Sequence, residues 1–143
     1  MTNQEKVIQL AKTQLGVKEY VNGSNKQIET YHKFSSPKNN TPMDDSVPWC
    51  SSFMCWCFES AGLDSTNSAS ARSWMKYGKE TKEPKLGDVV VFWRESKSSG
   101  KGHVGLFMGF TKQGNINVLG GNQSDMVCIQ PRSKDQLLGF RTY

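Results

Sequence analysis

The strongest constraint in the sequence is the run at residues 49–61, WCSSFMCWCFESA, which contains no glycine or proline. Coiled as a helix, this run carries aromatic or sulfur-containing side chains on almost every side, and Gly62 supplies a stop immediately after it. A helix that is apolar all round has to be buried. We therefore predict a central buried helix over residues 49–61, which the rest of the chain must cover.

Helix signals lie on both sides of this run. Residues 2–5, TNQE, match a capping box, and apolar residues recur at helical spacing from there to Gly16. Residues 24–27 repeat the capping signature before a short helical segment, and residues 35–46 are rich in Ser, Pro and Asn, which is typical of a surface loop. Residues 70–77 predict one more short helix.

The remainder of the chain changes to short runs of β-favouring residues, separated by Gly, Pro and Asn. Helices first and strands afterwards predict an α+β fold, with N-terminal helices packed on a C-terminal antiparallel sheet. The chain shows no internal repeat, and its 143 residues suit a single domain over residues 1–143. The predicted strands are residues 89–92, 104–108, 116–119, 127–129 and 138–141.

Composition bears on location and partners. No apolar run is long enough to cross a bilayer, and residues 1–12 lack the charged-then-apolar layout of a secretory signal. We expect a monomeric protein that is made in the cytoplasm and does not insert into a membrane. The 18 Lys and Arg against 13 Asp and Glu give a net charge of +5. This charge suits an anionic partner such as nucleic acid, an anionic lipid face or an acidic wall polymer, without choosing among them.

Three of the four cysteines, Cys50, Cys55 and Cys57, lie within the apolar run. On a helix, residues two positions apart point to nearly opposite faces, which excludes a shared metal or a bridge between Cys55 and Cys57. A zinc site needs four ligands in paired spacings, and only the two histidines and Cys128 remain to complete one. We expect no metal ion and no disulfide, with Cys55, Cys57 and Cys128 as buried, unreactive thiols.

Cys50 differs from the other cysteines because it stands at the predicted helix start, directly after Pro48 and Trp49. The unpaired N–H groups and the dipole of a helix start favour an anion, so a thiolate at this position is stabilised and activated as a nucleophile. By residue type alone, a small buried core residue is the commoner role for a cysteine.

His103 is the candidate base. It follows a Gly-containing basic loop at residues 94–102, which we expect to be flexible, and it opens the strand GHVGLFMG. The next strand ends in VLGGNQSD, where two glycines before Asn122 let the backbone approach its neighbour closely. A Cys–His pair supplies a nucleophile and an acid/base, and an Asn can hydrogen-bond the distal imidazole nitrogen and fix its tautomer. A lone histidine at a strand start is equally well a half-exposed surface residue.

Four segments together resemble one known group. PWCSSFMCWCFESAG, PKLGDVVVFW, GHVGLFMG and VLGGNQSD are similar, in order and spacing, to the motifs of the NlpC/CHAP group of papain-like cysteine peptidoglycan hydrolases, which occur in phage lysins and bacterial wall-degrading proteins. The resemblance extends from residues 16–20 to residues 137–143. It implies a papain-like fold, Cys50 as nucleophile, His103 as base, Asn122 as the polar group that orients the base, and no cofactor. Some CHAP domains carry a Glu two positions before the Asn, where this chain has Gly120.

The resemblance also implies a reaction. The substrate would be peptidoglycan, cut at an amide bond of its stem peptide by an N-acetylmuramoyl-L-alanine amidase or an endopeptidase, in the periplasm or outside the cell. A holin or a secretion apparatus would then be the delivery partner, an immunity protein would be a further partner, and nucleic acid is not expected. Two alternatives stay open: a non-catalytic module that binds wall polymer or nucleic acid, and a papain-like effector that acts on another amide or ester.

The basic loop and the tryptophans have two interpretations each. Arg94, Lys97 and Lys101 stand beside His103 in the sequence and could contact peptide carboxylates, although Lys-rich loops are usually only solvated. Core packing is the commoner role for the three tryptophans that could otherwise wall a groove, Trp49, Trp74 and Trp93.

Overall fold

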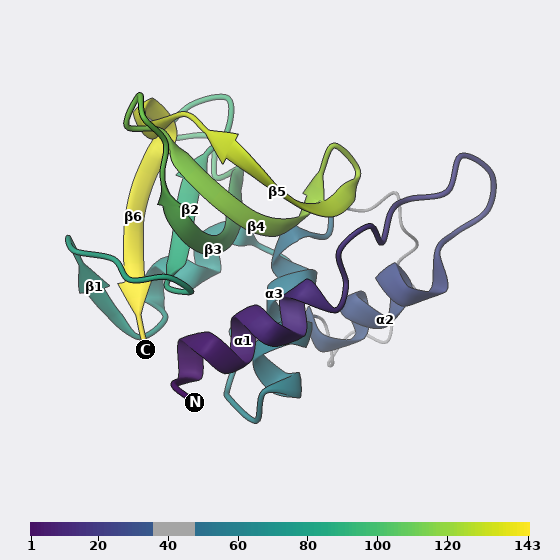
Figure 1. Ribbon diagram of the computed structural model, residues 1–143. Coiled ribbons are helices and arrows are strands. Elements are labelled where there is room, and N and C mark those ends of the chain that lie inside the picture. The colour runs from purple at the N-terminus through teal and green to yellow at the C-terminus, as the bar shows by residue number, and fades with distance from the viewer. Residues whose placement is uncertain (36–47) are drawn as a thin grey trace.

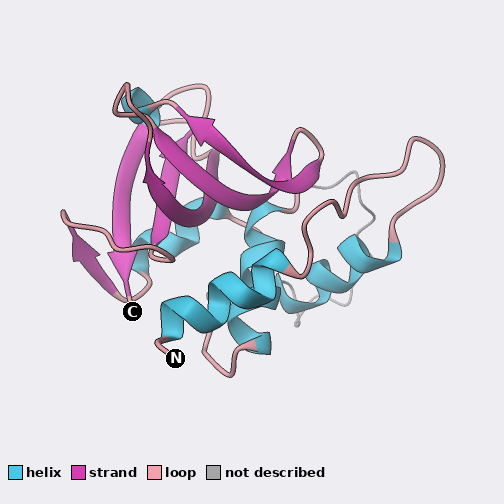
Figure 2. Ribbon diagram, in the orientation of Figure 1, coloured by secondary structure: helices cyan, strands magenta, loops and turns pink. Residues whose placement is uncertain are grey.

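The computed structural model describes residues 1–35 and 48–143, which form three α-helices and a six-stranded antiparallel sheet. The helices α1 (Asn3–Lys12), α2 (Lys26–Ser35) and α3 (Cys50–Ser60) gather on one side of the curved sheet (Figure 1; Figure 2). The prediction of N-terminal helices packed on a C-terminal antiparallel sheet is confirmed. The remaining elements are η1 (Ala71–Lys76), β1 (Lys79–Thr81), β2 (Val89–Trp93), β3 (Gly102–Phe110), β4 (Ile116–Gln123), β5 (Met126–Arg132), η2 (Lys134–Gln136) and β6 (Leu137–Thr142).

The helix boundaries agree closely with the sequence signals. Thr2 caps α1 by accepting a hydrogen bond from the Glu5 backbone N–H at 3.1 Å, as the capping box predicts. The second cap belongs to Asn25, whose Oδ1 accepts from the Gln27 N–H at 2.8 Å. Residues 36–46 of the predicted surface loop lie outside the described residues. The short segment at residues 70–77 forms the 3-10 helix η1, and the three-residue strand β1 was not predicted.

α3 is the buried centre of the fold, as its composition predicts. Phe53, Met54 and Phe58 are fully buried on it. The ring of Tyr31 on α2 packs against α3, with its centroid 5.1 Å from that of Phe53 and 5.9 Å from that of Trp49. Such aromatic pairs stabilise a core beyond their buried area. α2 therefore covers one side of α3, and the sheet covers another.

The sheet runs in the order β1-β6-β2-β3-β4-β5, with every described pair antiparallel. Side chains on one face of the sheet belong to the main core around α3. Side chains on the other face form a smaller apolar cluster. His103 on β3 is paired directly with Phe92 on β2, so both side chains lie on the same face as the smaller cluster. The members of that cluster are Val90, Phe92, Phe107, Ile116, Val118 and Phe140.

Both termini are held at the sheet. The Gln4 side-chain amide on α1 donates to Asp88 Oδ1 at 3.1 Å and to the backbone carbonyl of Tyr143 at 2.8 Å. Asp88 also accepts from the Lys85 N–H at 2.9 Å, so this buried carboxylate joins the N-terminal helix, the start of β2 and the end of the chain. Figure 1 accordingly shows the N- and C-termini close together.

The predicted core residues are confirmed in most cases. Trp49 and Trp74 are fully buried, whereas Trp93 is half-buried. All four cysteines carry free thiols, and Cys55 and Cys57 are fully buried. Cys128 was expected to be buried and is half-buried instead, because its strand, β5, is the last in the sheet.

α3 approaches β4 very closely at Gly121. A Cβ atom at this position would stand 2.7 Å from Trp49 Cζ3 and 2.8 Å from Phe53 Cβ. Only a glycine admits the start of α3 this near to the strand. The glycine therefore fixes the distance between the first turn of α3 and the end of β4, where the candidate site lies.

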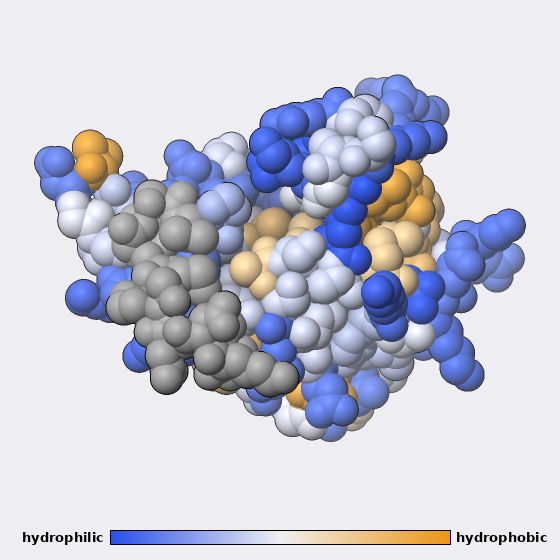
Figure 3. All heavy atoms as spheres, turned by 180° about the vertical axis from the view of Figure 1, so that it is seen from behind, coloured by the Kyte–Doolittle hydropathy of each residue, from blue (hydrophilic) through white to orange (hydrophobic). Residues whose placement is uncertain are grey.

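The described residues on the face opposite to the view of Figure 1 are mainly hydrophilic. Seen from behind, charged and polar residues dominate, and apolar side chains show in patches between them (Figure 3). Within the described residues, no helix combines the length and the apolar character that a membrane span requires.

Candidate active site

Cys50 is the first residue of α3. The residue that precedes it, Trp49, stands at the N-cap position and makes no capping hydrogen bond with its side chain. The N–H groups of the first helical turn have no partner within the helix, so they stay available to a ligand when no side chain caps them. The predicted placement of Cys50 at a helix start is confirmed.

Cys50 and His103 line the same cavity, which has a volume of about 270 Å³. Both side chains are almost completely buried, with exposures of 7% and 3%, so the cavity is their route to solvent. The sequence separates them by 53 positions, and the packing of α3 against β3 brings them together. The other lining residues are Pro48, Ala69, Ser70, Ala71, Arg94, Gly100, Lys101, Gly102, Asn122 and Arg132.

A buried glutamine holds the imidazole. Nε2 of His103 lies 2.9 Å from Oε1 of Gln123. The Gln123 amide nitrogen donates to the carbonyls of Val118 at 3.1 Å and Cys128 at 2.8 Å, which fixes the amide with its oxygen toward the imidazole. Because an amide oxygen only accepts, Nε2 must carry the proton. Nδ1 is then the unprotonated nitrogen, and it is the one that can act as a base.

This contact differs from the sequence prediction, which assigned it to Asn122. The register pairs Leu106 with Leu119, and its regular extension would place Asn122 opposite His103. β4 instead has an irregularity between Gly120 and Gln123, and Asn122 adopts a positive φ of 56°. The extra residue turns Gln123 toward His103 and leaves Asn122 half-buried at the cavity.

Gly120 provides the space for this glutamine. A Cβ atom on Gly120 would lie 3.1 Å from Gln123 Oε1 and 3.4 Å from its Cδ, a tighter contact than ordinary packing. The position where some CHAP domains carry a Glu is therefore empty of side chain here, and the Gln123 amide lies beside it. The only indication of Gln123 in the sequence is that it directly follows Asn122. The alternation of side chains along a strand does not predict where a bulge occurs.

Burial keeps both groups neutral. It raises the pKa of the Cys50 thiol, against the opposing influence of the Val104 and Ser51 backbone amides and the charges of Arg94 and Arg132. Burial also lowers the pKa of His103 to about 3, helped by the charge of Arg132 and opposed by the Gln123 hydrogen bond. The helix start was predicted to favour a thiolate, but removal from water outweighs the helix contribution here. The resting pair is therefore a thiol and a neutral imidazole.

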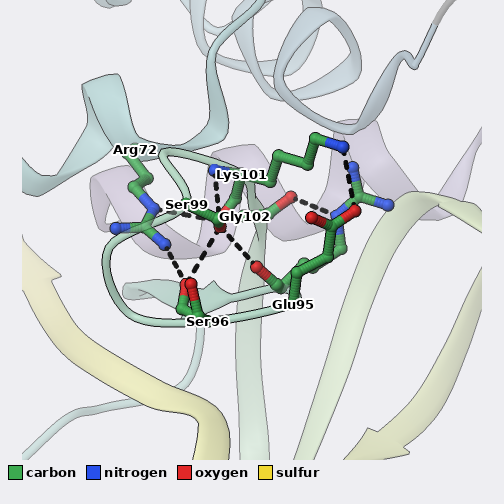
Figure 4. Close-up of polar contacts among 7 residues, drawn as sticks. Arg72, Glu95, Ser96, Ser99, Lys101 and Gly102 are labelled. Carbon is green, nitrogen blue, oxygen red and sulfur yellow. Dashed lines mark hydrogen bonds and ion pairs between the residues drawn. The ribbon is translucent and has the colours of Figure 1, made fainter.

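The loop before His103 is held more firmly than its composition suggests. Arg72 on η1 donates to three backbone carbonyls of this loop. Figure 4 shows the contacts with Lys101 at 2.9 Å and Ser96 at 3.0 Å, and the third is with Lys97 at 2.6 Å. Lys101 also forms an ion pair with Glu95 at 2.8 Å. The prediction of a flexible loop overlooked Arg72, which lies more than twenty positions earlier in the chain. Of the three loop cations, Arg94 and Lys101 line the cavity, and Lys97 is not among the lining residues.

The sequence profile of the CHAP domain matches residues 42–122, more than half of the chain, and this segment includes Cys50, His103 and Asn122. The chain belongs to the CHAP domain family. No curated protein matches the sequence.

Solved structures share the fold of this CHAP domain. RipD from Mycobacterium tuberculosis superposes with a TM-score of 0.58 at 20% identity, over 98% of this chain and 95% of that one. The P60 domain of an antigen from M. avium paratuberculosis gives 0.55 at 16% identity, over 99% and 93%. RipB from M. tuberculosis gives 0.57 at 23% identity, over 96% of this chain and 62% of RipB. The predicted papain-like NlpC/CHAP architecture is thus confirmed as an NlpC/P60-like fold.

The same fold occurs with and without catalysis. RipB is described as a peptidoglycan hydrolase, and RipD as a non-catalytic NlpC/P60 domain protein adapted to peptidoglycan binding. Activity must therefore be argued for this CHAP domain from its own side chains. Within the described residues, no group of three or more His, Cys, Asp or Glu side chains is arranged to hold a metal ion.

The buried thiol of this CHAP domain leads to a pH prediction. With its pKa raised above the ordinary value, Cys50 is mostly protonated at neutral pH, so its alkylation by iodoacetamide should rise roughly tenfold per pH unit through pH 7 and 8. Peptide-resolved mass spectrometry would follow Cys50 separately from the half-buried Cys128. A rate that is already at its plateau near pH 6 would show a preformed thiolate and contradict this electrostatic account.

Proposed function

We propose that this chain is a cysteine amidase or peptidase that hydrolyses an amide bond in the stem peptide of peptidoglycan, with Cys50 as nucleophile and His103 as base. One observation carries the proposal: Cys50 and His103 open onto one cavity, and Gln123 fixes the imidazole tautomer that leaves Nδ1 unprotonated. A base with a fixed tautomer that shares a cavity with a thiol is the arrangement that a nucleophile–base mechanism requires. Membership of the CHAP domain family supports the choice of peptidoglycan as substrate.

The reaction begins with two neutral groups. As the Cys50 sulfur attacks the amide carbonyl carbon, its proton moves to Nδ1 of His103. The oxyanion that forms is stabilised by the uncapped N–H groups of the first turn of α3. The imidazolium then protonates the leaving amine while the C–N bond breaks, which leaves a thioester on Cys50. Neutral His103 next deprotonates a water molecule, which attacks the thioester, releases a carboxylic acid and restores the thiol.

Gln123 and Asn122 take different parts in this proposal. Gln123 is a positioning residue, because it holds Nε2 and has its own amide fixed by two backbone carbonyls. Through Nε2 it also stabilises the imidazolium that forms during attack, as the orienting group does in other nucleophile–base sites. Asn122 lines the cavity, where its side chain is placed to contact the substrate.

The direct test is digestion of purified sacculi, followed by mass analysis of the released fragments. The wild type should release fragments with one new amine and one new carboxyl end, and their masses identify the bond. Cys50→Ala should lose the activity by at least about 10³-fold. Cys55→Ala is the matched control, because it removes a buried thiol of the same helix that does not line the cavity.

Binding of sacculi by the wild type without cleavage would contradict the proposed hydrolase activity and favour a non-catalytic wall-binding module. Cleavage by a folded Cys50→Ala variant would contradict the assignment of Cys50 as the nucleophile. The Cys55→Ala variant should retain turnover and lose stability, by about 1 kcal/mol or more, through the small void that it opens in the core.

Variants of the two neighbouring β4 residues separate positioning from substrate contact. Gln123→Ala should lower kcat by about 10²-fold with little change in KM, because the wrong tautomer and a looser ring affect the base alone. Asn122→Ala should act mainly on KM. His103→Ala should leave almost no activity. Steady-state kinetics on a soluble peptidoglycan fragment that still contains the scissile amide would measure these effects, and a larger loss of kcat in Asn122→Ala than in Gln123→Ala would reverse the two roles.

A further inference from the structure

The cavity beside Cys50 is lined by three cationic side chains, Arg94, Lys101 and Arg132, and by no Asp or Glu among the described residues. Lys101 is already paired with Glu95, which does not line the cavity. Neither Arg94 nor Arg132 forms an ion pair in residues 1–35 and 48–143, although the Glu95 carboxylate, which pairs with Lys101, also interacts electrostatically with Arg94. Two arginines are therefore left to face the same space.

Arg132 is the more deeply placed of the two. It is the last residue of β5 and half-buried, with its guanidinium carbon 5.7 Å from the centroid of the Phe92 ring. That contact covers a face of the guanidinium and leaves its N–H edge without an acceptor among the described residues. No local pattern indicated this residue, because it lies 82 positions from Cys50 and ends an ordinary strand.

Arg94 is exposed, but it is anchored at its inner end. Its Nε donates to the Gly102 carbonyl at 3.0 Å, and its backbone N–H donates to the Lys101 carbonyl at 3.1 Å. Its terminal nitrogens make no hydrogen bond within the described part of the chain, and Arg94 lines the cavity. The loop that carries Arg94 is in turn held by Arg72. The two guanidinium groups thus have fixed positions before any ligand arrives.

Like charges in one partly buried space are unfavourable unless an anion joins them. Burial lowers the pKa of Arg132, the nearby Cys50 sulfur raises it, and the charge of Arg94 lowers it further, so the two arginines act on each other as well as on the thiol. Both charges also act on Cys50 and His103, so the anion that would relieve their repulsion must lie next to the reacting atoms.

We propose that Arg132 and Arg94 form a carboxylate-binding subsite beside Cys50, so that the preferred substrate is an amide with a free carboxylate close to the scissile bond. This proposal rests on the proposed function for its substrate class. A carboxylate suits the site because the planar guanidinium fork binds its two oxygens in parallel. The subsite thereby selects acidic stem peptides over those in which the carboxylate is masked as a carboxamide.

The subsite can be tested without hydrolysis by comparing two alkylating reagents of nearly equal size. Iodoacetate carries a carboxylate and iodoacetamide does not, and both form an Sγ–C bond at Cys50 with loss of iodide and of the thiol proton. The ratio of the iodoacetate rate to the iodoacetamide rate should be about 10-fold or more higher at Cys50 than for glutathione, because one charge-assisted pair contributes at least that much. Using the ratio cancels any change in the reactivity of the thiol itself.

Three variants show whether the arginines cause the preference. Arg132→Gln and Arg94→Gln should each lower the ratio most of the way to the glutathione value. Because Arg94 is exposed, Arg94→Gln should fold even if Arg132→Gln does not. Lys97→Gln is the matched control, because it removes one charge from the same loop outside the cavity, and its ratio should equal that of the wild type. A wild-type ratio equal to that of glutathione, or an equal drop in Lys97→Gln, would overturn the subsite.

A second arm connects the subsite to catalysis. Two synthetic peptides that differ only in a carboxylate or a carboxamide beside the cleaved amide should differ in kcat/KM by about 10-fold or more, and Arg132→Gln should remove the difference. Equal kcat/KM values in the wild type would overturn the substrate preference while leaving the hydrolase intact. Absence of cleavage with the iodoacetate preference preserved would contradict the proposed function and support the subsite.

Discussion

The burial of α3 decides where every functional group of this chain lies. The helix is apolar on almost all sides, so α2 and the sheet close around it, and Gly121 lets its first turn approach β4 without an intervening side chain. This packing places Cys50, the first residue of the helix, at the ends of β3 and β4 that carry His103 and Gln123. The packing of α3 that stabilises the core therefore also brings the residues of the candidate site together. The same packing shields these residues from water.

Burial has an electrostatic consequence that distinguishes this site from a preformed ion pair. A thiolate and an imidazolium both lose hydration in the interior, and the neighbouring arginines further disfavour the imidazolium. The pair therefore rests in its neutral form, and in the proposed mechanism charge separates only when the substrate supplies a carbonyl to attack. In the same proposal, the start of α3 stabilises the negative charge of the oxyanion, and the arginine pair binds the negative charge of the substrate.

The sequence was sufficient for the fold class, the central helix and the placement of Cys50 and His103, because each has a local signal: apolar residues on all sides of a helix, a helix start, a glycine-flanked strand. Gln123 was missed because one bulge exchanges the roles of adjacent residues, and regular strand alternation favours Asn122. Arg132 and Arg72 were missed because their roles depend on tertiary contacts that no local pattern encodes. The raised pKa of Cys50 likewise depends on how much of the helix start is buried.

The central claim is that His103 rests as a neutral imidazole with its proton on Nε2, held there by Gln123. Nitrogen NMR of protein labelled in its imidazole rings measures this directly, with the His103→Gln spectrum to assign the signals. We predict a protonated Nε2 and an unprotonated Nδ1 at pH 7, unchanged at about pH 5, where an ordinary histidine would be charged. An imidazolium at pH 7, or a proton on Nδ1, would contradict it.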